Sequence, residues 1–565
     1  MKDRFREEIG TKERDKWAEF NWKLIKRRVK KLRQRIFRAT QKKEWNRVRS
    51  LMKLMLRSRD NLLLAIKRVS QINKGKNTAG VDGRKVNTNS QRLSLFLEIQ
   101  QDASWKAKPT RRVYIPKSNG KKRPLGIPTI KDRVLQSIVK NALEPSWEAQ
   151  FEATSYGFRP GRSIHDAITY SHNRLRKGMD NWVLDADIKG AFDNISHNHI
   201  LKTLGNVPGI KLIEQWLKAG YVENEVFNTT KSGTPQGGII SPLLANIALH
   251  GLSDLLDQFK KVKVYQSSPN AKRQRTNKQK LPKFGYCRYA DDFIVTAENE
   301  EDLTEVIPII EKWLQERGLK LNKEKTQVVN TKDGFSFLGF TIRKFNQSCF
   351  CFPQKDKVLK FLQDIRNWLK KHKDIPAIDV INHLNPILTG WANNYRMGAS
   401  KRVFSYINHQ IFRALWLWAK RRHPNKGKKW IARKYFNINW RFKAKHQNRR
   451  GDNQTLTLVN IAEITIVRHV MVKGENSPDN PELKKYWEER QTNFGKKSFA
   501  LGSRDYKVAC NQNWKCPVCG EGLFNGEDLH QHHIKQVKDG GYDYEDNLIF
   551  IHKACHQDLH SAKGA

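Results

Sequence analysis

Cysteines and long apolar runs are both scarce in this sequence. Seven cysteines occur among 565 residues, too few for the disulfide framework of a small secreted domain. The most apolar stretch, residues 237–249, is broken by Ser241, Pro242 and Asn246, whereas a membrane-spanning helix needs roughly 18 apolar residues. The first ten residues mix both charge signs and contain no apolar stretch, unlike a secretory signal. We therefore expect an intracellular protein in a reducing compartment, with no membrane partner.

Acidic residues are the next shortage. The chain carries 56 Asp and Glu against 106 Lys and Arg, a formal net charge of +50, and residues 381–451 contain no acid at all. Such an excess repels itself unless a polyanion neutralises it, so nucleic acid is the predicted partner. Hydrophobic residues make up 38% of the chain, which excludes a disordered polycation. At roughly 150 residues per domain, the length predicts about three to five domains.

Residues 21–50 predict a basic amphipathic helix. They hold 13 Lys and Arg but one acid, Glu44, and apolar residues recur at helical spacing from Leu24 to Phe37. A solvated helix face is one interpretation of the cations. A single acid leaves almost nothing to pair them within the segment, so we favour contact with nucleic acid.

Residues 78–345 alternate short β-rich runs with helical stretches, separated by Gly and Pro turns. This pattern predicts one α+β domain. Within it, residues 260–283 are polar, basic and rich in turn formers, and we expect them to form an insertion loop.

Two β-type runs of this domain end in acidic residues. Asp291 and Asp292 lie at a predicted hairpin tip, and another run ends in Asp185 and Asp187. Carboxylates that converge from different strands can hold two Mg²⁺ ions about 3.5–4 Å apart, a spacing that stabilises the attacking and leaving oxygens of an in-line displacement. An isolated Asp-Asp pair would more simply cap a surface turn. Further motifs in the same domain favour the metal site.

These motifs follow one another in a fixed order. They are TAGVDG at 78–83, RRVYIPK…KKRPLGIPT at 111–129, DADIKGAFDNI at 185–195, SGTPQGGIISPLLANI at 232–247, RYADD at 288–292 and FLGF at 337–340. Together they resemble the motifs of reverse transcriptases, specifically the group II intron-encoded kind. The resemblance implies a right-hand fold with fingers and palm.

The same resemblance implies roles for the acids. Asp187, Asp291 and Asp292 would be the catalytic acids, with Asp187 and Asp291 as the principal ligands of two Mg²⁺ ions. Asp185 would be only a structural neighbour.

Four further residues would bind the incoming nucleotide. Phe192 matches the gate that excludes a 2′-hydroxyl, so the substrates would be dNTPs, added to a DNA primer on an RNA template. Lys117 and Arg123 match triphosphate-binding positions, and Gln236 matches a residue beside the nucleotide.

Residues 384–395 contain Trp391 and Tyr395, and residues 418–424 contain Trp418 beside Lys420, Arg421 and Arg422. Together they offer stacking platforms and phosphate-binding charge. Trp416 and Trp418 lie mid-helix and are also candidates for a core. These segments resemble the maturase, or X, region, the polymerase thumb of group II intron proteins. That implies binding of the structured intron RNA, which is recognised largely by shape and phosphate.

The C-terminal segment has a metal-ligand composition. Cys516 and Cys519 form a C-x₂-C pair, and His552 and Cys555 form a second pair 32 residues later. Four such ligands suit a closed tetrahedral Zn²⁺ site. Cys510 is left without a place in it.

The remaining polar residues of this segment resemble the ββα-metal fold of HNH endonucleases. The resemblance implies that His533 is the general base that activates water and that Asn547 fixes the loop between strand and helix. His532, His556 and His560 would hold one divalent ion, and the i, i+4 spacing of the last two places both on one helix face. A zinc domain that only binds DNA is the competing interpretation.

The sequence thus predicts an α+β multidomain protein: a right-hand reverse transcriptase, a helical thumb (maturase X) domain and a small ββα-metal HNH zinc domain. The expected boundaries are 1–75 for a basic helical extension of the fingers, 76–345 for fingers and palm, 346–430 for the thumb, 431–505 for a DNA-binding region and 506–565 for the endonuclease.

The expected function is that of a multifunctional group II intron protein. It would bind its intron RNA to assist splicing, nick target DNA and prime cDNA synthesis from the freed 3′-hydroxyl. It would use two Mg²⁺ ions, a structural Zn²⁺ and a divalent ion at the HNH site, in a cytoplasmic ribonucleoprotein of a bacterial cell or an organelle. One alternative is a reverse transcriptase of another class, retron or diversity-generating. The other is a non-enzymatic RNA-binding splicing factor.

Overall fold

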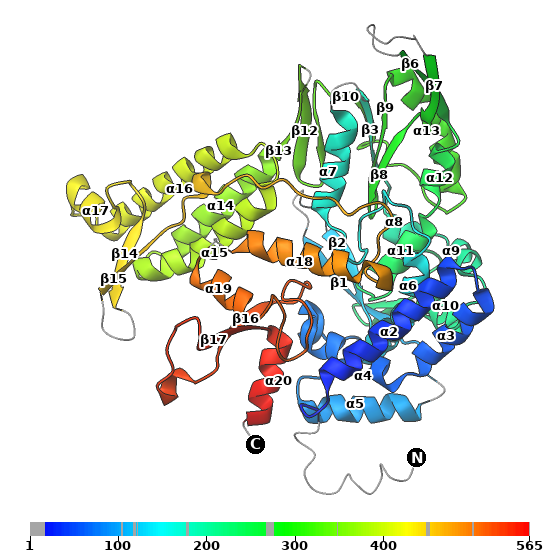
Figure 1. Cartoon of the computed structure of the whole chain (residues 1–565), viewed down its shortest axis with the longest axis horizontal. Helices are drawn as coiled ribbons and strands as arrows, with labels where there is room; N and C mark the ends of the chain where they lie inside the picture. Colours follow the sequence, from blue (N-terminus) through cyan, green and yellow to red (C-terminus); the bar gives the residue numbers. More distant parts are fainter. Residues whose placement is uncertain are drawn as a thin grey trace, which may run out of the picture.

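The computed structural model describes residues 17–102, 105–116, 120, 122–176, 180–266, 276–346, 348–447, 453–499 and 502–563. The chain runs from a helical group near its N-terminal end, through central sheets and helices, to a second helical group (Figure 1). A long segment with little regular structure then returns towards the N-terminal helices, where the last helix lies (Figure 1). Within the described ranges, no helix is both long and apolar enough to cross a membrane.

The N-terminal group is built from amphipathic helices. It comprises α2 (Trp22–Gln41), α3 (Trp45–Arg57), α4 (Arg59–Lys67), the π-helical turn η1 (Arg68–Ile72), the 3-10 turn η2 (Lys74–Asn77) and α5 (Asn89–Gln101). At the start of α2 the Asn21 side chain accepts a hydrogen bond from Leu24 N at 2.9 Å, a typical N-cap. The apolar stripe of α2 is buried from Ile25 to Phe37, whereas Leu24 is 38% exposed. The helix predicted for residues 21–50 therefore exists, but a turn at Lys43, with φ of +58°, divides it in two.

Two four-stranded sheets form the centre of the molecule. The first has the order β2-β1-β4-β5 and comprises β1 (Thr110–Pro116), β2 (Lys122–Ile127), β4 (Tyr221–Glu223) and β5 (Val226–Asn228). The second has the order β10-β3-β9-β8 and comprises β3 (Trp182–Asp187), β8 (Gly285–Tyr289), β9 (Asp292–Ala297) and β10 (Gln327–Asn330). All pairings in the second sheet are antiparallel.

Helices join these sheets to the N-terminal group. They are α6 (Ile130–Glu148), α7 (Ile164–Leu175), α8 (Ala191–Asn194), α9 (His197–Leu204), α10 (Ile210–Lys218), α11 (Ser241–Ala248), α12 (Leu252–Leu256) and α13 (Glu300–Gln315). One apolar cluster contains residues of α2, α3, α6, β3, β9, α11 and α13. A continuous core thus holds the N-terminal helices against the sheet that carries the acids. Helices and antiparallel strands share this core, which confirms the α+β class.

The described parts of the segment 260–283 are mostly strand, while residues 267–275 lie outside the described residues. β6 (Lys260–Gln266) and β7 (Thr276–Pro282) form an antiparallel hairpin, with Lys260 opposite Pro282. Val262 and Val264 alternate with lysines, which is the period of a strand. For residues 260–266 and 276–282 the expectation of an insertion loop was wrong, because it gave polar composition more weight than this alternation.

The second helical group follows a three-stranded sheet. The sheet consists of β11 (Phe335–Phe337), β12 (Phe340–Phe345) and β13 (Ser348–Pro353). The group consists of α14 (Lys355–Lys371), α15 (Ala377–Tyr395), α16 (Lys401–Arg422), α17 (Lys428–Tyr435) and the hairpin of β14 (Lys443–Gln447) and β15 (Asn453–Thr457). Trp418 is buried, whereas Trp440 is 58% exposed. The tryptophans therefore divide between core and surface.

Residues 458–480 form a strap from this group back to the N-terminal helices (Figure 1). It contains the 3-10 turn η3 (Ile461–Glu463) and leads into η4 (Pro481–Leu483) and α18 (Lys484–Ser498). Val472 N donates to the buried carboxylate of Asp166 at 2.8 Å. Part of the predicted DNA-binding region is therefore packed inside the molecule.

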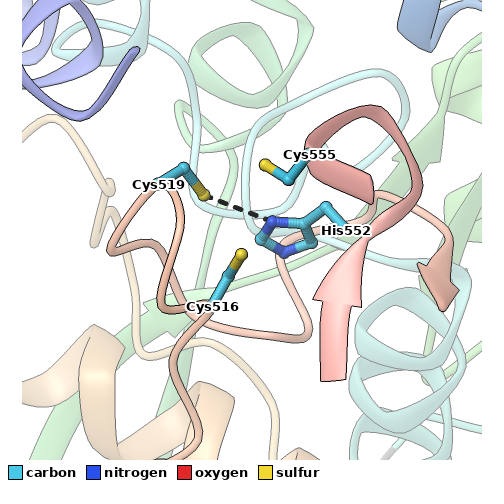
Figure 2. Close-up of side chains that lie close together, drawn as sticks. All are labelled: Cys516, Cys519, His552 and Cys555. Atoms are coloured by element: carbon cyan, nitrogen blue, oxygen red, sulfur yellow. Dashed lines mark hydrogen bonds between the residues drawn. The ribbon is translucent and has the colours of Figure 1, made fainter. Parts of the chain in front are cut away.

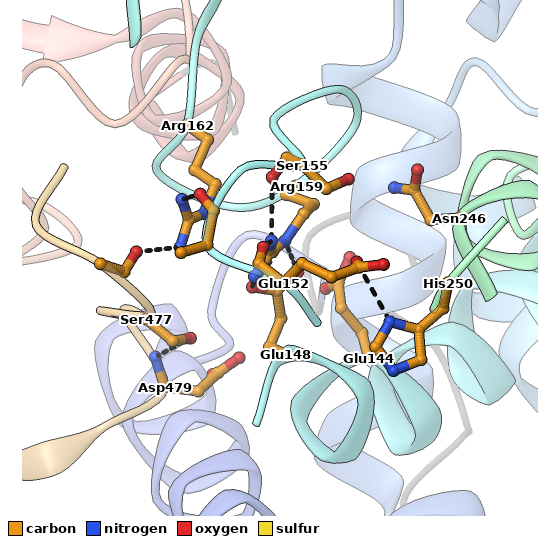
Figure 3. Close-up of polar contacts among 12 residues, drawn as sticks. Glu144, Glu148, Glu152, Ser155, Arg159, Arg162, Asn246, His250, Ser477 and Asp479 are labelled. Atoms are coloured by element: carbon orange, nitrogen blue, oxygen red, sulfur yellow. Dashed lines mark hydrogen bonds and ion pairs between the residues drawn. The ribbon is translucent and has the colours of Figure 1, made fainter. Parts of the chain in front are cut away.

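Buried charges join the strap to the centre. Arg33 of α2 pairs with Asp479 of the strap at 2.7 Å and with Glu144 of α6 at 3.0 Å. Nearby, Arg159 pairs with Glu148 at 3.1 Å (Figure 3). Burial alone would raise the pKa of Glu144, but Lys140 and Arg33 lower it to about 2. At least one cation of α2 is thus neutralised by distant acids, which a charge count within residues 21–50 cannot reveal.

The C-terminal unit has its own small core. It contains α19 (Arg504–Asn511), the antiparallel ribbon of β16 (Leu529–His533) and β17 (Leu548–His552), the 3-10 turn η5 (Val537–Asp539) and α20 (Lys553–Lys563). Trp514, Leu523 and Phe550 are buried in it. The order ribbon-then-helix is the ββα arrangement that the sequence predicts.

Candidate functional site

The central acids lie where the strands of the second sheet end. Asp187, the last residue of β3, is opposite Asp292, the first residue of β9. Ala290 and Asp291 form the two-residue turn between β8 and β9. Directly opposite residues of an antiparallel pair share a face, and so do residues two apart in one strand. Asp185, Asp187 and Asp292 therefore project to the same side of the sheet.

This turn is held from behind. Arg288, which is 1% exposed, donates through Nη1 to Asn246 Oδ1 at 3.0 Å and to Ala290 O at 3.3 Å. Ala290 has φ of +61°, a conformation that residues with a Cβ seldom adopt. A Cβ on Gly157 would lie 2.3 Å from Ala290 N, so only glycine fits behind the turn. These contacts fix the tip that carries Asp291.

The carboxylates at this tip repel one another. Burial, followed by Asp291 and Asp187, raises the pKa of Asp292 to about 6. Burial, followed by Asp292 and Asp187, raises the pKa of Asp185 to about 7. Burial and Asp187 also raise the pKa of Asp291. A divalent cation favours the ionised forms that this crowding disfavours, and carboxylate oxygens are the ligands that Mg²⁺ prefers.

Two residues without a predicted role contact Asp187. Lys325 Nζ and Asn322 Nδ2 each donate to Asp187 Oδ2 at 2.9 Å. Both belong to the motif GLKLNKEKT at 318–326, but nothing in its sequence indicates that it returns to β3. Among the described residues, two sets of side chains bring three or more potential metal ligands within 4.8 Å of one another. They are the cysteine and histidine sets described below. The acids of this tip do not form such a set.

Three of the predicted nucleotide-binding residues lie in the described part of the chain, and Arg123 links them to the acids. Arg123 Nε donates to Gln236 Oε1 at 2.9 Å, and Gln236 Nε2 donates to Asp193 Oδ2 at 3.1 Å. Arg123 is close enough to Asp291 to favour its ionised form. The Gln236 amide is thus oriented from both ends, and sequence reasoning did not identify Asp193 as one of its partners.

Phe192 lies in the same pocket wall as Gln236. It lines a pocket of about 240 Å³ together with Gln236, and its ring packs edge-on against Phe158 with centroids 6.1 Å apart. Its side chain is 7% exposed, so it has a fixed position. Lys117, the fourth predicted residue, lies outside the described residues.

The Cys₃His set consists of Cys516, Cys519, His552 and Cys555. Figure 2 shows the four side chains pointing toward one another. Their ligand atoms all lie within 4.8 Å of one another and all four residues are buried. Cys519 Sγ is 3.3 Å from His552 Nδ1. Three thiols and an imidazole enclosed in this way fit the closed coordination of structural Zn²⁺.

The His₃ set consists of His532 from β16 with His556 and His560 from α20. Their ligand atoms also lie within 4.8 Å of one another, and the Nε2 atoms of His556 and His560 are 3.1 Å apart. His532 is buried whereas His560 is exposed. Burial, followed by repulsion from His560, His532 and His530, lowers the pKa of His556 to about 4. Three imidazoles that are open to solvent on one side can hold one divalent ion and leave room for a further ligand.

His533 and Asn547 lie beside this set. His533 Nε2 is 2.5 Å from Asp543 Oδ1, a partner that the sequence did not indicate. Asn547 Oδ1 accepts from Lys535 N at 2.8 Å, and its Nδ2 donates to Tyr542 O at 2.8 Å. Asn547 therefore closes the loop between β16 and β17, while the Asp543 carboxylate orients the His533 ring. Cys510 lies at the end of α19 and does not belong to the Cys₃His set.

Four parts of the chain match known protein families. Residues 115–342 match reverse transcriptase (RNA-dependent DNA polymerase), and residues 17–99 match the N-terminal domain of reverse transcriptase. Residues 358–436 match the maturase-specific domain of group II introns, and residues 516–562 match HNH endonuclease.

Curated relatives agree with these matches. Protein YkfC of Escherichia coli (strain K12) is 35% identical over 316 residues, which cover 52% of this chain and 82% of that protein. The group II intron-encoded protein LtrA of Lactococcus lactis subsp. cremoris is 29% identical over 412 residues, which cover 59% of this chain and 68% of LtrA. The chain therefore belongs to the group II intron-encoded proteins, as a reverse transcriptase and maturase with an HNH endonuclease domain.

Proposed function

We propose that this protein binds its own intron RNA to promote splicing and then copies that RNA into a DNA target. The HNH domain nicks one strand of the target, and the freed 3′-hydroxyl primes cDNA synthesis. The observation that carries the proposal is the meeting of Asp187, Asp291 and Asp292 with Arg123 and Gln236. In this proposal, ligands for divalent ions and donors for a triphosphate would lie close to one another, as polymerisation of nucleotides requires.

In this proposal the central sheets and the N-terminal helices form the fingers and palm of a right hand, and α14–α17 form the thumb. The domain boundaries are those expected from the sequence, with the endonuclease in 506–565 and a DNA-binding region in 431–505. The substrates are dNTPs, an RNA template, a DNA primer and target DNA. The protein would act in a ribonucleoprotein of a bacterial cytoplasm or an organelle.

The proposed chemistry of the polymerase site rests on the acids. Asp187 and Asp291, with Asp292 beside them, would hold two Mg²⁺ ions. When bound, such ions neutralise charge on the attacking and leaving oxygens of an in-line displacement. The two aspartates supply the negative charge that retains these cations in a protein of net charge +50.

The proposed nucleotide contacts come from the neighbouring side chains. Arg123 and Lys117 would bind the triphosphate oxygens, since charge-assisted hydrogen bonds to phosphate are the stronger kind. Gln236, oriented by Arg123 and Asp193, would lie beside the nucleotide. The fixed ring of Phe192 would occupy the space of a 2′-hydroxyl, which favours dNTPs over ribonucleotides.

The proposed nicking reaction belongs to His533. Its imidazole would take the proton from the water that attacks the scissile phosphate, and Asp543 would stabilise the imidazolium that forms. The bond from phosphorus to the 3′-oxygen breaks, and the leaving oxygen takes a proton from solvent to become the primer hydroxyl. The His₃ set would hold a divalent ion that neutralises charge on the phosphate, whereas the Cys₃His set would hold Zn²⁺ and maintain the fold.

Primer extension on an RNA template with dNTPs and Mg²⁺ tests the polymerase assignment. Asp291→Asn is expected to lower the rate by on the order of 10²–10³-fold or more, because it removes a ligand charge. Asp257→Asn, at the exposed end of α12, is the matched control and should extend like the wild type. Equal rates for Asp291→Asn and wild type would show that these acids are not the polymerase site. If the wild type does not extend primers, the alternative function, an RNA-binding splicing factor without polymerase activity, would be favoured.

A further inference from the structure

The HNH domain is fixed to the N-terminal helices by buried charges. Asp558 of α20 forms an ion pair with Lys67 of α4, which is 1% exposed, and accepts from Gln71 Nε2 at 3.0 Å. The Lys67 ammonium lies 3.9 Å from the centre of the Trp22 ring. A second ion pair joins Lys26 to Glu527 at 3.2 Å. Removing one partner of a buried ion pair leaves an uncompensated buried charge, so these pairs hold the HNH domain against the helices.

A cleft of about 980 Å³ opens beside this junction. Every residue that lines it is polar or charged. One wall belongs to η1, η2 and the start of α5, and the other belongs to α20. The lining residues that bear on its chemistry are Lys76, Asn77, Asn89, Arg92, Gln557 and His560. Because His560 also belongs to the His₃ set, the cleft leads directly to the candidate endonuclease site.

Among the described residues, the cations of this cleft hydrogen-bond to neutral groups. Arg92, which is 7% exposed, donates to Ser70 Oγ at 3.1 Å, to Asn89 Oδ1 at 2.7 Å and to Asn87 O at 2.8 Å. Lys76 Nζ donates to Gln71 O at 3.1 Å. All of these acceptors are neutral. Within the described part of the chain, no carboxylate forms an ion pair with Arg92 or Lys76. Asp558, whose charge favours ionised Arg92, forms its ion pair with Lys67.

Without a bound anion, the positive charge of Arg92 and Lys76 in this cleft is therefore unfavourable. Burial lowers the pKa of Arg92 to about 10. Burial, followed by repulsion from Lys553 and Arg92, lowers the pKa of Lys76. A bound anion would offset both penalties, because the hydrogen-bond acceptors of Arg92 and Lys76 are all neutral and Asp558 only partly opposes the effect of burial on Arg92. A wall of cations, amides and hydroxyls is the composition with which proteins bind a phosphate backbone.

We propose that this cleft binds the phosphate backbone of the DNA strand that enters the HNH site, so that the N-terminal region of the reverse transcriptase completes the substrate site of the endonuclease. The inference rests on the proposed nicking function of the His₃ set and His533. It adds Lys76 and Arg92 as residues that bind DNA although they belong to another domain. The polar lining contacts the backbone and holds the strand whatever its sequence.

The first test compares two lysines of the same short turn. Lys76 lines the cleft, whereas Lys74 is exposed and does not. The full chain, assembled with its intron RNA, is assayed for nicking of target DNA at increasing salt. Lys76→Gln is expected to nick roughly tenfold more slowly at physiological salt, as for one lost charge-assisted contact, and to reduce the slope of log affinity against log salt by about one. Lys74→Gln should nick like the wild type, and both variants should extend primers normally.

The second test reports on binding without depending on catalysis. Lysines of the full chain are acetylated with and without a short DNA duplex, and the modified sites are quantified by mass spectrometry. Lys76 should be protected several-fold by the duplex, and Lys74 should be protected less. Equal protection of both lysines, or nicking by Lys76→Gln that matches Lys74→Gln, would overturn the cleft proposal while leaving the endonuclease intact. Protection of Lys76 by an RNA duplex but not by DNA would overturn the choice of DNA. If the wild type does not nick, the endonuclease proposal fails, and the acetylation pattern still decides whether the cleft binds DNA.

Discussion

Cys555 and His556 are consecutive residues of α20, yet they belong to two sets of ligands with different access to solvent. All four members of the Cys₃His set are buried, whereas the His₃ set runs from buried His532 to exposed His560. A closed set of four leaves no position for water or substrate, whereas an open set of three does. One helix can therefore serve a structural site and a reactive site, because neighbouring residues leave it in different directions.

The largest expected difference between the two sets is in folding. Cys519→Ser should abolish zinc binding, and the apparent binding energy of structural zinc sites is about 10–16 kcal/mol, most of the stability that so small a domain can have. We expect zinc content to fall from one atom per chain to none and the HNH domain to become protease-sensitive. Metal analysis and limited proteolysis measure both.

The matched control is Cys510→Ser, since Cys510 lies outside the Cys₃His set. It should keep its zinc and its protease resistance. Primer extension should survive in both variants, because the core of the central sheets contains no residue of the HNH domain. If the Cys519→Ser protein kept its zinc, the Cys₃His set would not be the structural zinc site, and the proposed difference between the two sets would fail.

The next largest expected effect is on the nicking reaction and not on folding. His533→Ala should lower nicking by about 10²–10⁴-fold, the usual contribution of a general base, while zinc content and primer extension stay unchanged. His409→Ala, on the exposed face of α16, is the control for a lost imidazole. Loss of nicking and polymerisation together would mean that the two active sites are not separate.

The smallest expected effect is a response to pH. The pKa of His556 is lowered to about 4 from its usual 6.5. A group with a lowered folded-state pKa contributes stability above its unfolded pKa and loses it as the pH falls through the folded value. The Tm of the HNH domain, loaded with zinc only, should therefore decline as the pH falls from about 6.5 towards about 4. His556→Asn should show a weaker decline in the same thermal scan, and an equal decline would contradict this role of His556.

Sequence reasoning succeeded where a local pattern brings the side chains together. The two-residue turn of Ala290 and Asp291 follows from the flanking β-type runs, and the two pairs of the Cys₃His set follow from their spacing. Such geometry depends on a few bonded neighbours, so it can be predicted from one stretch of chain.

Contacts between distant segments could not be predicted in this way. Lys325 contacts Asp187 across 138 residues, and Arg33 contacts Asp479 across 446. Nothing near Lys325 or Arg33 in the sequence specifies these partners, because they are chosen by how the sheets, the strap and the helices pack. The cations of residues 21–50 illustrate the consequence: a count of local charges treated all of them as available to nucleic acid, whereas Arg33 is used internally.

The ion pair of Lys67 and Asp558 also orders events during synthesis. Its two members are 491 residues apart. At about 5–20 residues per second, Asp558 is made roughly 25–100 s after Lys67. During that interval the N-terminal helices must stay folded while Lys67 contacts the Trp22 ring but lacks its ion-pair partner, Asp558. The nascent chain can therefore complete its polymerase before its nuclease, and the cleft between them is the last of these surfaces to form.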